Sequence, residues 1–358
     1  MRVLIVVPDL ALGGVTTVVK NLVNKLNNSK YKILIVSLKP TSIKEFHQCK
    51  VRNLNINNKF NYFLSIGKLN IIIREFKPNI IHSHTVYSHL IIRFIKILKL
   101  SSFIHICSEH NTLSAKDINK TWILFKITNK YSDLITFVSQ YSINSYIENG
   151  LVSGNKVKLL YNGVNFNIFD NHNKFSENIN GYNFAYIGRL SKEKNLFNLL
   201  KAILLIKKNL NDFKLCIVGE GDQEDELKKF VNDNGLSDNV DFLGHKNNVI
   251  PIMKNIDLLI LSSDTEGLPM VILEAMAMQC NVVSTECGGI PEIFTGIPSF
   301  LAKINDPEDL ASKILDNINL SKEERKEIGV LYKKQVINKF SIDKYASELE
   351  KIYKSLIN

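Results

Sequence analysis

The sequence predicts an α/β fold with two domains, each built around a doubly wound parallel sheet. The chain has 358 residues, which suffices for two domains of roughly 150 residues each. Short runs rich in β-branched residues are continuously apolar, which is typical of strands buried on both faces of a parallel sheet. These runs alternate with longer amphipathic stretches, and that alternation indicates repeated strand–helix–strand units.

The first half of the chain supplies one such series. Strands are expected at residues 2–7, 32–37, 80–83, 103–107 and 134–138, and helices at 16–26, 88–99 and 122–130. The alternation pauses at residues 161–181, where Asn, Phe and Asp dominate and little periodicity remains. We therefore predict a first domain over residues 1–170, with a connection near residue 170.

The alternation then resumes and predicts a second domain over residues 171–340. Strands are expected at residues 184–187, 214–218, 240–243, 258–261 and 281–284, and helices at 196–208, 223–234 and 270–278. The end of the chain, from about residue 306, has a mostly helical pattern. Both halves therefore resemble Rossmann-like domains, which bind ligands at the carboxyl ends of their strands.

Composition excludes several classes of protein. Lys and Arg number 45 against 35 Asp and Glu, and the resulting charge of +10 suits a phosphate ligand, nucleic acid or an anionic membrane. No apolar run reaches the roughly 20 residues of a spanning helix, and Pro8 and Asp9 interrupt the apolar start, so neither a membrane span nor a secretory signal is expected. Five cysteines without a CxxC pair argue against disulfides and structural zinc, and favour a reducing cytoplasm.

Two acidic residues mark the first candidate site. Glu266 and Glu274 stand eight positions apart in SSDTEGLPMVILEAMAMQC. Glu266 is expected in the loop after a buried strand, and Glu274 about two turns into the following helix, because proline suits the first helical turn. Backbone at this helix start would face an anion, over Leu268, Pro269, Met270 and Val271. The alternative is that the two acids only compensate a helix dipole on a solvated face.

Cations and glycines mark two more candidates. Arg189 and Lys194, in GRLSKEKN directly after a strand, could clamp a diphosphate, although cations on a solvated loop are common in a Lys-rich chain. Gly13 and Gly14 follow the first strand and would let backbone N–H groups approach a phosphate or sugar. The pair lacks the third glycine of GxGxxG, and a plain tight turn would use the same residues.

Histidines form the last group. His110 follows a strand and could hydrogen-bond a ligand hydroxyl, or simply be satisfied within its loop. His82 and His84 share a strand face and His89 is near in sequence, but we find no carboxylate that would complete a metal site. Asp264 and Glu266 form a DTE string that could mimic a metal-binding motif. Since Arg189 and Lys194 can neutralise a phosphate, no metal is required.

Taken in order, these motifs resemble the retaining, GT-B-fold glycosyltransferases of the group 1 type, which are similar to glycosyltransferase family 4. The series covers nearly the whole chain and runs through PDLALGG, SEHN, YNGVN, GRLSKEKN, GEGDQEDELKKF, FLGHKNN, TEGLPMVILEAMA and GGIPEI. The two glutamates with seven intervening residues are its most specific mark. The resemblance implies a cleft between two domains and a final helix, within residues 341–358, that packs back on the first domain.

The resemblance also implies a role for each matching residue. Glu274 would accept hydrogen bonds from the ribose and Glu266 would hold sugar hydroxyls of a nucleotide-sugar donor. Arg189 and Lys194 would neutralise the diphosphate, assisted by Gly14 and the helix start, and His110 would approach the sugar. The residues expected to border the base are Gly219, Gly221 and His245. Asn162 would lie where the chain crosses between domains.

The implied reaction is hexosyl or N-acetylhexosaminyl transfer, with retention, from a nucleotide sugar to a hydroxyl of a glycan or lipid-linked acceptor. UDP is the preferred leaving group, no cofactor or metal is expected, and the setting would be bacterial surface polysaccharide synthesis such as capsule or lipopolysaccharide. The segment 88–100 carries Arg93, Lys96 and Lys99 amid apolar residues, which fits either a peripheral contact with anionic membrane or a core helix with cations outside. A non-catalytic partner subunit of the same fold is the alternative function, and the absence of a recognition motif disfavours nucleic acid.

Overall fold

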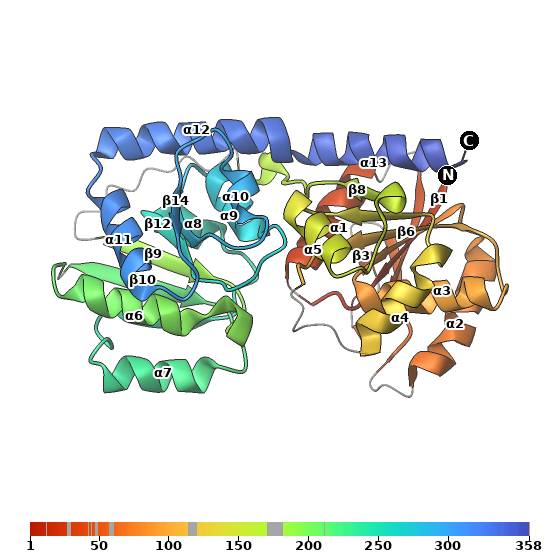
Figure 1. The fold of residues 1–358 in the computed structure, drawn as a ribbon, viewed down its shortest axis with the longest axis horizontal. Coiled ribbons are helices and arrows are strands. Elements are labelled where there is room, and N and C mark those ends of the chain that lie inside the picture. Colours follow the sequence, from red (N-terminus) through yellow and green to blue (C-terminus); the bar gives the residue numbers. More distant parts are fainter. Residues whose placement is uncertain are drawn as a thin grey trace. The chain divides into compact units, whose positions relative to one another are not determined.

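The structure is a computed structural model that describes residues 1–11, 13–26, 30–41, 43, 45–46, 49–56, 61–113, 120–169, 182–210 and 212–357. The chain divides into two compact units, which are coloured along the sequence in Figure 1. Unit 1 comprises Met1–Gly163 and Ile342–Asn358, and unit 2 comprises Val164–Ser341. The connection expected near residue 170 falls in residues 170–181, which lie outside the described residues.

Unit 1 contains a sheet with the strand order β3-β4-β2-β1-β5-β6-β7-β8. Its strands are β1 (Arg2–Val7), β2 (Lys32–Ser37), β3 (Glu45–Phe46), β4 (Cys49–Asn53), β5 (Ile80–His84), β6 (Ile104–Glu109), β7 (Leu134–Phe137) and β8 (Val157–Leu159). The helices are α1 (Gly14–Leu26), α2 (Asn61–Phe76), α3 (Val86–Ile97), α4 (Lys120–Thr128), α5 (Gln140–Glu148) and α13 (Ile342–Ile357). All neighbouring strands run parallel except β3 and β4. The central strands β5 and β6 are buried except at Ile104, as expected of strands covered on both faces of a parallel sheet.

Unit 2 contains a second sheet, with the strand order β11-β10-β9-β12-β13-β14 and parallel neighbours throughout. Its strands are β9 (Tyr182–Ile187), β10 (Phe213–Val218), β11 (Val240–Gly244), β12 (Leu258–Leu261), β13 (Asn281–Thr285) and β14 (Phe300–Ala302). The helices are α6 (Leu196–Lys207), α7 (Glu224–Asp233), α8 (Ile250–Asn255), α9 (Met270–Ala277), α10 (Ile290–Ile293), α11 (Pro307–Ile318) and α12 (Lys322–Phe340). The predicted fold class is confirmed: both sheets are Rossmann-like.

The last helix belongs to the first unit, as expected. Helix α13 packs against α1, and the Tyr353 hydroxyl lies 2.8 Å from Nδ1 of His82 on β5. Where the chain leaves unit 1, Gly163 packs so closely that an added Cβ would come within 2.7 Å of the Ile342 Cα. Gly163 also accepts a hydrogen bond from Asn21, and the preceding Asn162 is buried. These contacts give the YNGVN segment a structural role.

The basic face expected on segment 88–100 is wrong in one respect. Arg93 is fully buried: its Nε donates to Ser132 Oγ at 2.8 Å and its guanidinium stacks 4.2 Å from the centre of the Phe125 ring. Lys96 lies 2.5 Å from a carboxylate oxygen of Asp133. An amphipathic pattern assigns cations to the surface, whereas here polar groups of α4 and of the turn after it satisfy the guanidinium. Among the described residues, no helix combines the length and apolar character that crossing a bilayer requires.

Candidate active site

In unit 2, two predicted residues meet at the carboxyl ends of neighbouring strands. Strand β12 is buried over its whole length and leads into the loop that carries Glu266. Its neighbour β9 leads into a short 3-10 turn, Lys192–Lys194. Lys194 Nζ lies 2.7 Å from Glu266 Oε1, with 19% and 10% of the two side chains exposed. The same carboxylate oxygen accepts a hydrogen bond from Ser263 Oγ at 2.7 Å.

Further hydrogen bonds fix these two loops against each other. Ser262 Oγ donates to the Lys194 carbonyl at 3.0 Å, and the Asp264 N–H donates to the Glu193 carbonyl at 2.9 Å. The Asn195 side chain, at the N-cap of α6, donates to Asp264 Oδ1 at 2.7 Å. Sequence reasoning did not select Asn195 or Ser263, because short polar residues in loops carry no distinctive signal.

A turn that contains two glycines packs against the backbone of Glu266. Gly288 has a left-handed backbone (φ 54°), and a Cβ there would lie 1.7 Å from the Glu266 carbonyl oxygen. The next amide, from Gly289, donates to the Gly267 carbonyl at 3.1 Å. The GGIPEI motif was quoted for the resemblance without a role. The structure gives its first two residues one: they allow the loop of Glu266 to pack directly on the turn after β13.

Two glycines expected near the base have similar packing. A Cβ at Gly219 would lie 1.9 Å from the Gly188 carbonyl oxygen, and one at Gly221 would lie 2.2 Å from the Leu190 carbonyl oxygen. These glycines therefore hold the backbone on both sides of Arg189. His245 is exposed, and its N–H is 3.4 Å from Glu220 Oε1. That these residues border a base remains a prediction.

The cations of this site already have anionic neighbours. Arg189, with 74% of its side chain exposed, lies 3.5 Å from Glu193. Burial alone would raise the pKa of Glu193, but the Ser191 hydrogen bond and the neighbouring cations lower it overall. Each of the two cations is thus paired with a carboxylate, Arg189 with Glu193 and Lys194 with Glu266. A diphosphate that binds these two cations must therefore displace the carboxylates from them.

Helix α9 begins directly after the Glu266 loop. Pro269 is its N-cap, so the anion-facing stretch expected over residues 268–271 is wrong at this position: proline has no N–H to donate. First-turn amides such as those of Met270 and Val271 have no carbonyl four residues earlier in the helix. Val271 and Glu274 are both partly exposed, and their spacing of three places them on one helix face.

In unit 1, His110 lies beside histidines of the neighbouring strand. Its Nε2 is 2.9 Å from Nδ1 of His84, and the ring of His84 in turn stacks on His82 at 4.5 Å. Burial and the electrostatic effect of neighbouring histidines lower the pKa of both His82 and His110 to about 3. These imidazoles are therefore neutral at physiological pH. Thr85, the residue after His84, has φ 67° and ψ 156°, a backbone conformation that is strained for a β-branched residue.

The turn after β1 lies at the same edge, because β1, β5 and β6 are consecutive in the sheet. Gly14 is the first residue of α1, and no heavy atom lies within 4 Å of a Cβ built on Gly13. The Gly13 carbonyl accepts from the Thr17 N–H at 3.0 Å. Packing among the described residues therefore does not require glycine at position 13, which leaves this backbone open to a ligand.

A second histidine cluster corrects one expectation. We expected no carboxylate near the strand histidines, but Glu109 is buried and lies 3.0 Å from Nε2 of His89. The Ser83 hydroxyl bridges His89 and His105 at 2.7 Å each. Sequence reasoning missed Glu109, although it directly precedes His110 in the SEHN motif.

Donor atoms of His89, His105 and Cys107 lie within 4.8 Å of one another, so we tested this cluster for metal binding. Burial alone would raise the pKa of the Cys107 thiol, but His105, His89 and Arg93 bring it well below its ordinary value. Arg93 Nη2 is only 3.6 Å from the sulfur. A cation already neutralises the sulfur and Ser83 already satisfies two ring nitrogens, so the cluster fits a hydrogen-bonded core better than a metal.

The fold is that of a GT-B glycosyltransferase. Residues 12–167 match the family Glycosyltransferase Family 4, and residues 167–334 match Glycosyl transferases group 1. An uncharacterized glycosyltransferase of Methanocaldococcus jannaschii is 32% identical over 356 residues, covering 96% of this chain and 95% of that protein. The chain therefore belongs to the group 1, family 4-like glycosyltransferases.

More distant relatives have named activities. N-acetyl-α-D-glucosaminyl L-malate synthase of Bacillus anthracis is 26% identical and covers 86% of this chain, with 83% of its own length matched. The capsular polysaccharide biosynthesis glycosyltransferase CapM of Staphylococcus aureus is 27% identical over 63% of this chain and 62% of its own. Among solved structures, Anabaena HepE in complex with UDP and glucose superposes with a TM-score of 0.86 at 19% identity, covering 99% of this chain and 100% of that one. At this identity the likeness confirms the fold.

Proposed function

We propose that this glycosyltransferase moves a hexosyl or N-acetylhexosaminyl group from a UDP-sugar to a hydroxyl of a glycan or lipid-linked acceptor, with retention and without a metal. The contact of Lys194 with Glu266 at the start of α9 carries the proposal. A cation, a carboxylate and helix-start amides thus come from two adjacent strand-end loops, as a charged leaving group and a hydroxylated sugar together require. The relatives named for N-acetylglucosaminyl transfer and capsule synthesis support this substrate class.

Donor binding starts with an exchange of partners. Without a donor, Lys194 neutralises Glu266. The diphosphate of an incoming donor takes Lys194 and Arg189, and the released Glu266 carboxylate accepts hydrogen bonds from the sugar hydroxyls. Glu274, on the exposed face of α9, accepts from the ribose. Ser263 keeps the Glu266 carboxylate oriented during this exchange because its hydroxyl donates to Oε1.

The transfer step breaks the bond between the anomeric carbon and the diphosphate oxygen, which keeps the electron pair. The acceptor oxygen forms its bond to the anomeric carbon on the same face, and its proton passes to the departing phosphate oxygen. The transition state resembles an oxocarbenium ion, so the cations act mainly by stabilising the leaving group. His110, which is neutral, serves as a hydrogen-bond partner for the sugar rather than as a charge.

A donor panel tests the proposal. The purified protein is incubated with UDP-, GDP- and dTDP-sugars and with L-malate, a lipid-linked sugar or water as acceptor, and nucleoside diphosphate release is measured. We expect release from a UDP-sugar, undiminished in EDTA, and NMR of the product should show the donor's anomeric configuration. Lys194→Met is the matched inactive control. A folded wild-type protein that neither binds UDP nor releases it would favour the non-catalytic partner subunit.

The reaction compartment is part of the same proposal. The five cysteines are all unpaired thiols, which a reducing cytoplasm would maintain. A lipid-linked acceptor would bring the protein to the inner face of the plasma membrane. Fractionation of cells that express the tagged full chain tests this expectation, since the protein should be recovered with cytoplasm or with salt-extractable membrane.

A further inference from the structure

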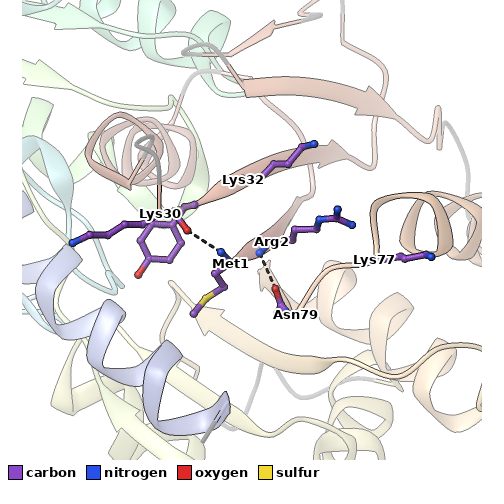
Figure 2. Close-up of a pocket in the computed structure, with 7 residues that line it drawn as sticks. Met1, Arg2, Lys30, Lys32, Lys77 and Asn79 are labelled. Atoms are coloured by element: carbon purple, nitrogen blue, oxygen red, sulfur yellow. Dashed lines mark hydrogen bonds between the residues drawn. The ribbon is translucent and has the colours of Figure 1, made fainter.

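The amino end of the unit 1 sheet carries a hollow that the glycosyltransferase reaction does not use. It has a volume of about 490 Å³ and lies where β1, β2 and β5 begin. Figure 2 shows the residues around it. Those that line it are Met1, Arg2, Lys30, Tyr31, Lys32, Lys77 and Asn79. The lining thus includes four cationic side chains and no carboxylate.

Two of the cations are forced together by strand register. Arg2 on β1 and Lys32 on β2 are direct partners across a parallel pair, so their side chains lie on the same face. Like charges in this position repel each other. Neither side chain forms an ion pair within the described part of the chain. An anion placed between them would turn this repulsion into attraction.

Lys77 adds a third cation from a residue with an unusual backbone. It follows the last residue of α2 with φ 48°, in the left-handed region that helix ends usually fill with glycine. The helix dipole accounts for a cation here in part. The dipole does not account for Lys32 or Lys30, which precede or begin a strand. In the view of Figure 2, Arg2, Lys32 and Lys77 extend toward one side and Lys30 toward the other.

Arg2 is held in place before any ligand binds. Its backbone N–H donates to Asn79 Oδ1 at 2.8 Å, and its Nη1 donates to the Phe76 carbonyl at 3.1 Å. The remaining guanidinium donors are exposed to solvent, since the residue lies at the surface. A preorganised guanidinium beside two lysines is the arrangement that recognises a multivalent oxyanion, because arginine binds two oxygens at once and lysines supply point charges.

One carboxylate lies outside the lining but beside one of its residues, Tyr31. Burial and the carboxylate of Glu350 on α13 raise the pKa of Tyr31, whose hydroxyl hydrogen-bonds to that carboxylate. A single acid leaves the four cations in excess. Removing the negative charge of Glu350 should strengthen the binding of an anion, whereas removing the positive charge of a lysine should weaken it.

We propose that this hollow, centred on Arg2, Lys32 and Lys77, binds a phosphate-type anion. The anion is either a free multivalent phosphate or the head group of an anionic phospholipid. The site lies at the opposite end of the strands from His110, about 16–20 Å away for strands of five or six residues. It is therefore separate from the carboxyl-edge loops of unit 1, and it does not depend on the proposed donor.

The test uses the full chain with Arg189→Ala and Lys194→Ala, which removes the donor-site cations. Binding of inorganic pyrophosphate is measured by calorimetry, and binding to vesicles by sedimentation with phosphatidylglycerol or with phosphatidylcholine alone. We expect Lys32→Glu with Lys77→Glu to weaken binding at least tenfold. The matched control reverses two exposed lysines of unit 2, Lys201→Glu with Lys229→Glu, and should leave binding within twofold.

The outcomes separate the two sources of the anion. Pyrophosphate binding that the first pair of changes abolishes identifies a free phosphate, and vesicle binding alone identifies a lipid head group. Glu350→Gln should lower the Kd for whichever probe binds. This measurement still tests the proposal if the charge-reversed protein fails to fold. Absence of binding for both probes, or equal loss in both double variants, would overturn the proposal.

Discussion

Neutralising Glu266 should tighten the binding of UDP, although the residue is placed in the machinery of transfer. In the structure Glu266 occupies Lys194 at 2.7 Å, so a diphosphate must compete for that cation. Glu266→Gln retains the side chain's shape and can still accept from Lys194 and Ser263. Only the negative charge is lost. UDP lacks the donor sugar, so the sugar-hydroxyl contacts expected of Glu266 do not enter this measurement.

The size of the effect follows from Coulomb's law. A carboxylate about 6 Å from a diphosphate of charge −2 repels it by about 1.4 kcal/mol in a water-like dielectric. Because both side chains are largely buried, the effective dielectric is lower and this value is a lower bound. We therefore expect the Kd for UDP to fall about tenfold or more. Turnover with the complete donor should fall at the same time.

Calorimetric titration with UDP at low ionic strength provides the assay. Glu226→Gln is the matched control, because it removes one carboxylate from the exposed surface of α7 and should leave the Kd unchanged. Lys194→Met should weaken binding. If Glu266→Gln left the Kd for UDP unchanged or raised it in a protein with wild-type Tm, the partner-exchange account of donor binding would be wrong.

Three further predictions concern single residues. Gly288→Ala should destabilise the protein by at least about 3 kcal/mol and abolish transfer, because the added Cβ would lie 1.7 Å from a carbonyl oxygen. Gly13→Ala is the control, because its added Cβ would have no neighbour within 4 Å. Denaturant unfolding of both variants measures the difference in stability. Burial holds the pKa of His82 at about 3, below its value of 6.5 when unfolded, so its contribution to stability is present above pH 6.5 and lost as the pH falls toward 3. Unfolding measured from pH 6.5 to 5 should show a slope that is shallower in His82→Gln, by about 0.7 kcal/mol per pH unit at pH 6.5 and about 1.3 at pH 5, but unchanged in His245→Gln. Glu274→Ala should weaken UDP binding at least tenfold by calorimetry, and an unchanged affinity would remove its ribose role.

Much of the fold could be predicted because buried parallel strands leave a strong signal. The runs at residues 2–7, 32–37 and 258–261 coincide with β1, β2 and β12. The strands β3, β4, β8 and β14 were not expected, because β3, β8 and β14 have only two or three residues and β4 (CKVRN) has exposed charged residues. Two- and three-residue strands are defined by their neighbours in the sheet and not by their own composition.

The candidate site was predictable in its residues but not in its charges. The sequence predicted Lys194 and Glu266 each in a loop that follows a strand, and the structure brings these two loops together. Sequence reasoning treated the lysine as free to bind phosphate. It could not show that the glutamate neutralises the lysine, because that contact spans 72 residues and depends on the register of β9 and β12.

The buried polar groups of unit 1 were misjudged for a related reason. Arg93 was assigned to a surface, and Glu109 was not recognised as the carboxylate beside His89. Arg93 is tolerated inside the protein because several partners from separate segments satisfy it at once, and the Glu109 carboxylate is paired with His89. Such mutual satisfaction is a property of three-dimensional packing, and no local pattern in the chain reports it.

The distribution of charge has a consequence for donor selection. In the unit 2 loops each cation has a carboxylate beside it, Glu193 for Arg189 and Glu266 for Lys194. The lining of the hollow of Figure 2, in contrast, includes four cationic side chains and no carboxylate. The chain's net charge of +10 therefore does not make the donor loops bind every anion without selectivity. A plain phosphate that takes Lys194 leaves Glu266 partly buried and unpaired, which is costly. A nucleotide sugar supplies hydroxyls to that carboxylate as it takes the lysine, so the ion pair itself favours the complete donor over its phosphate fragment.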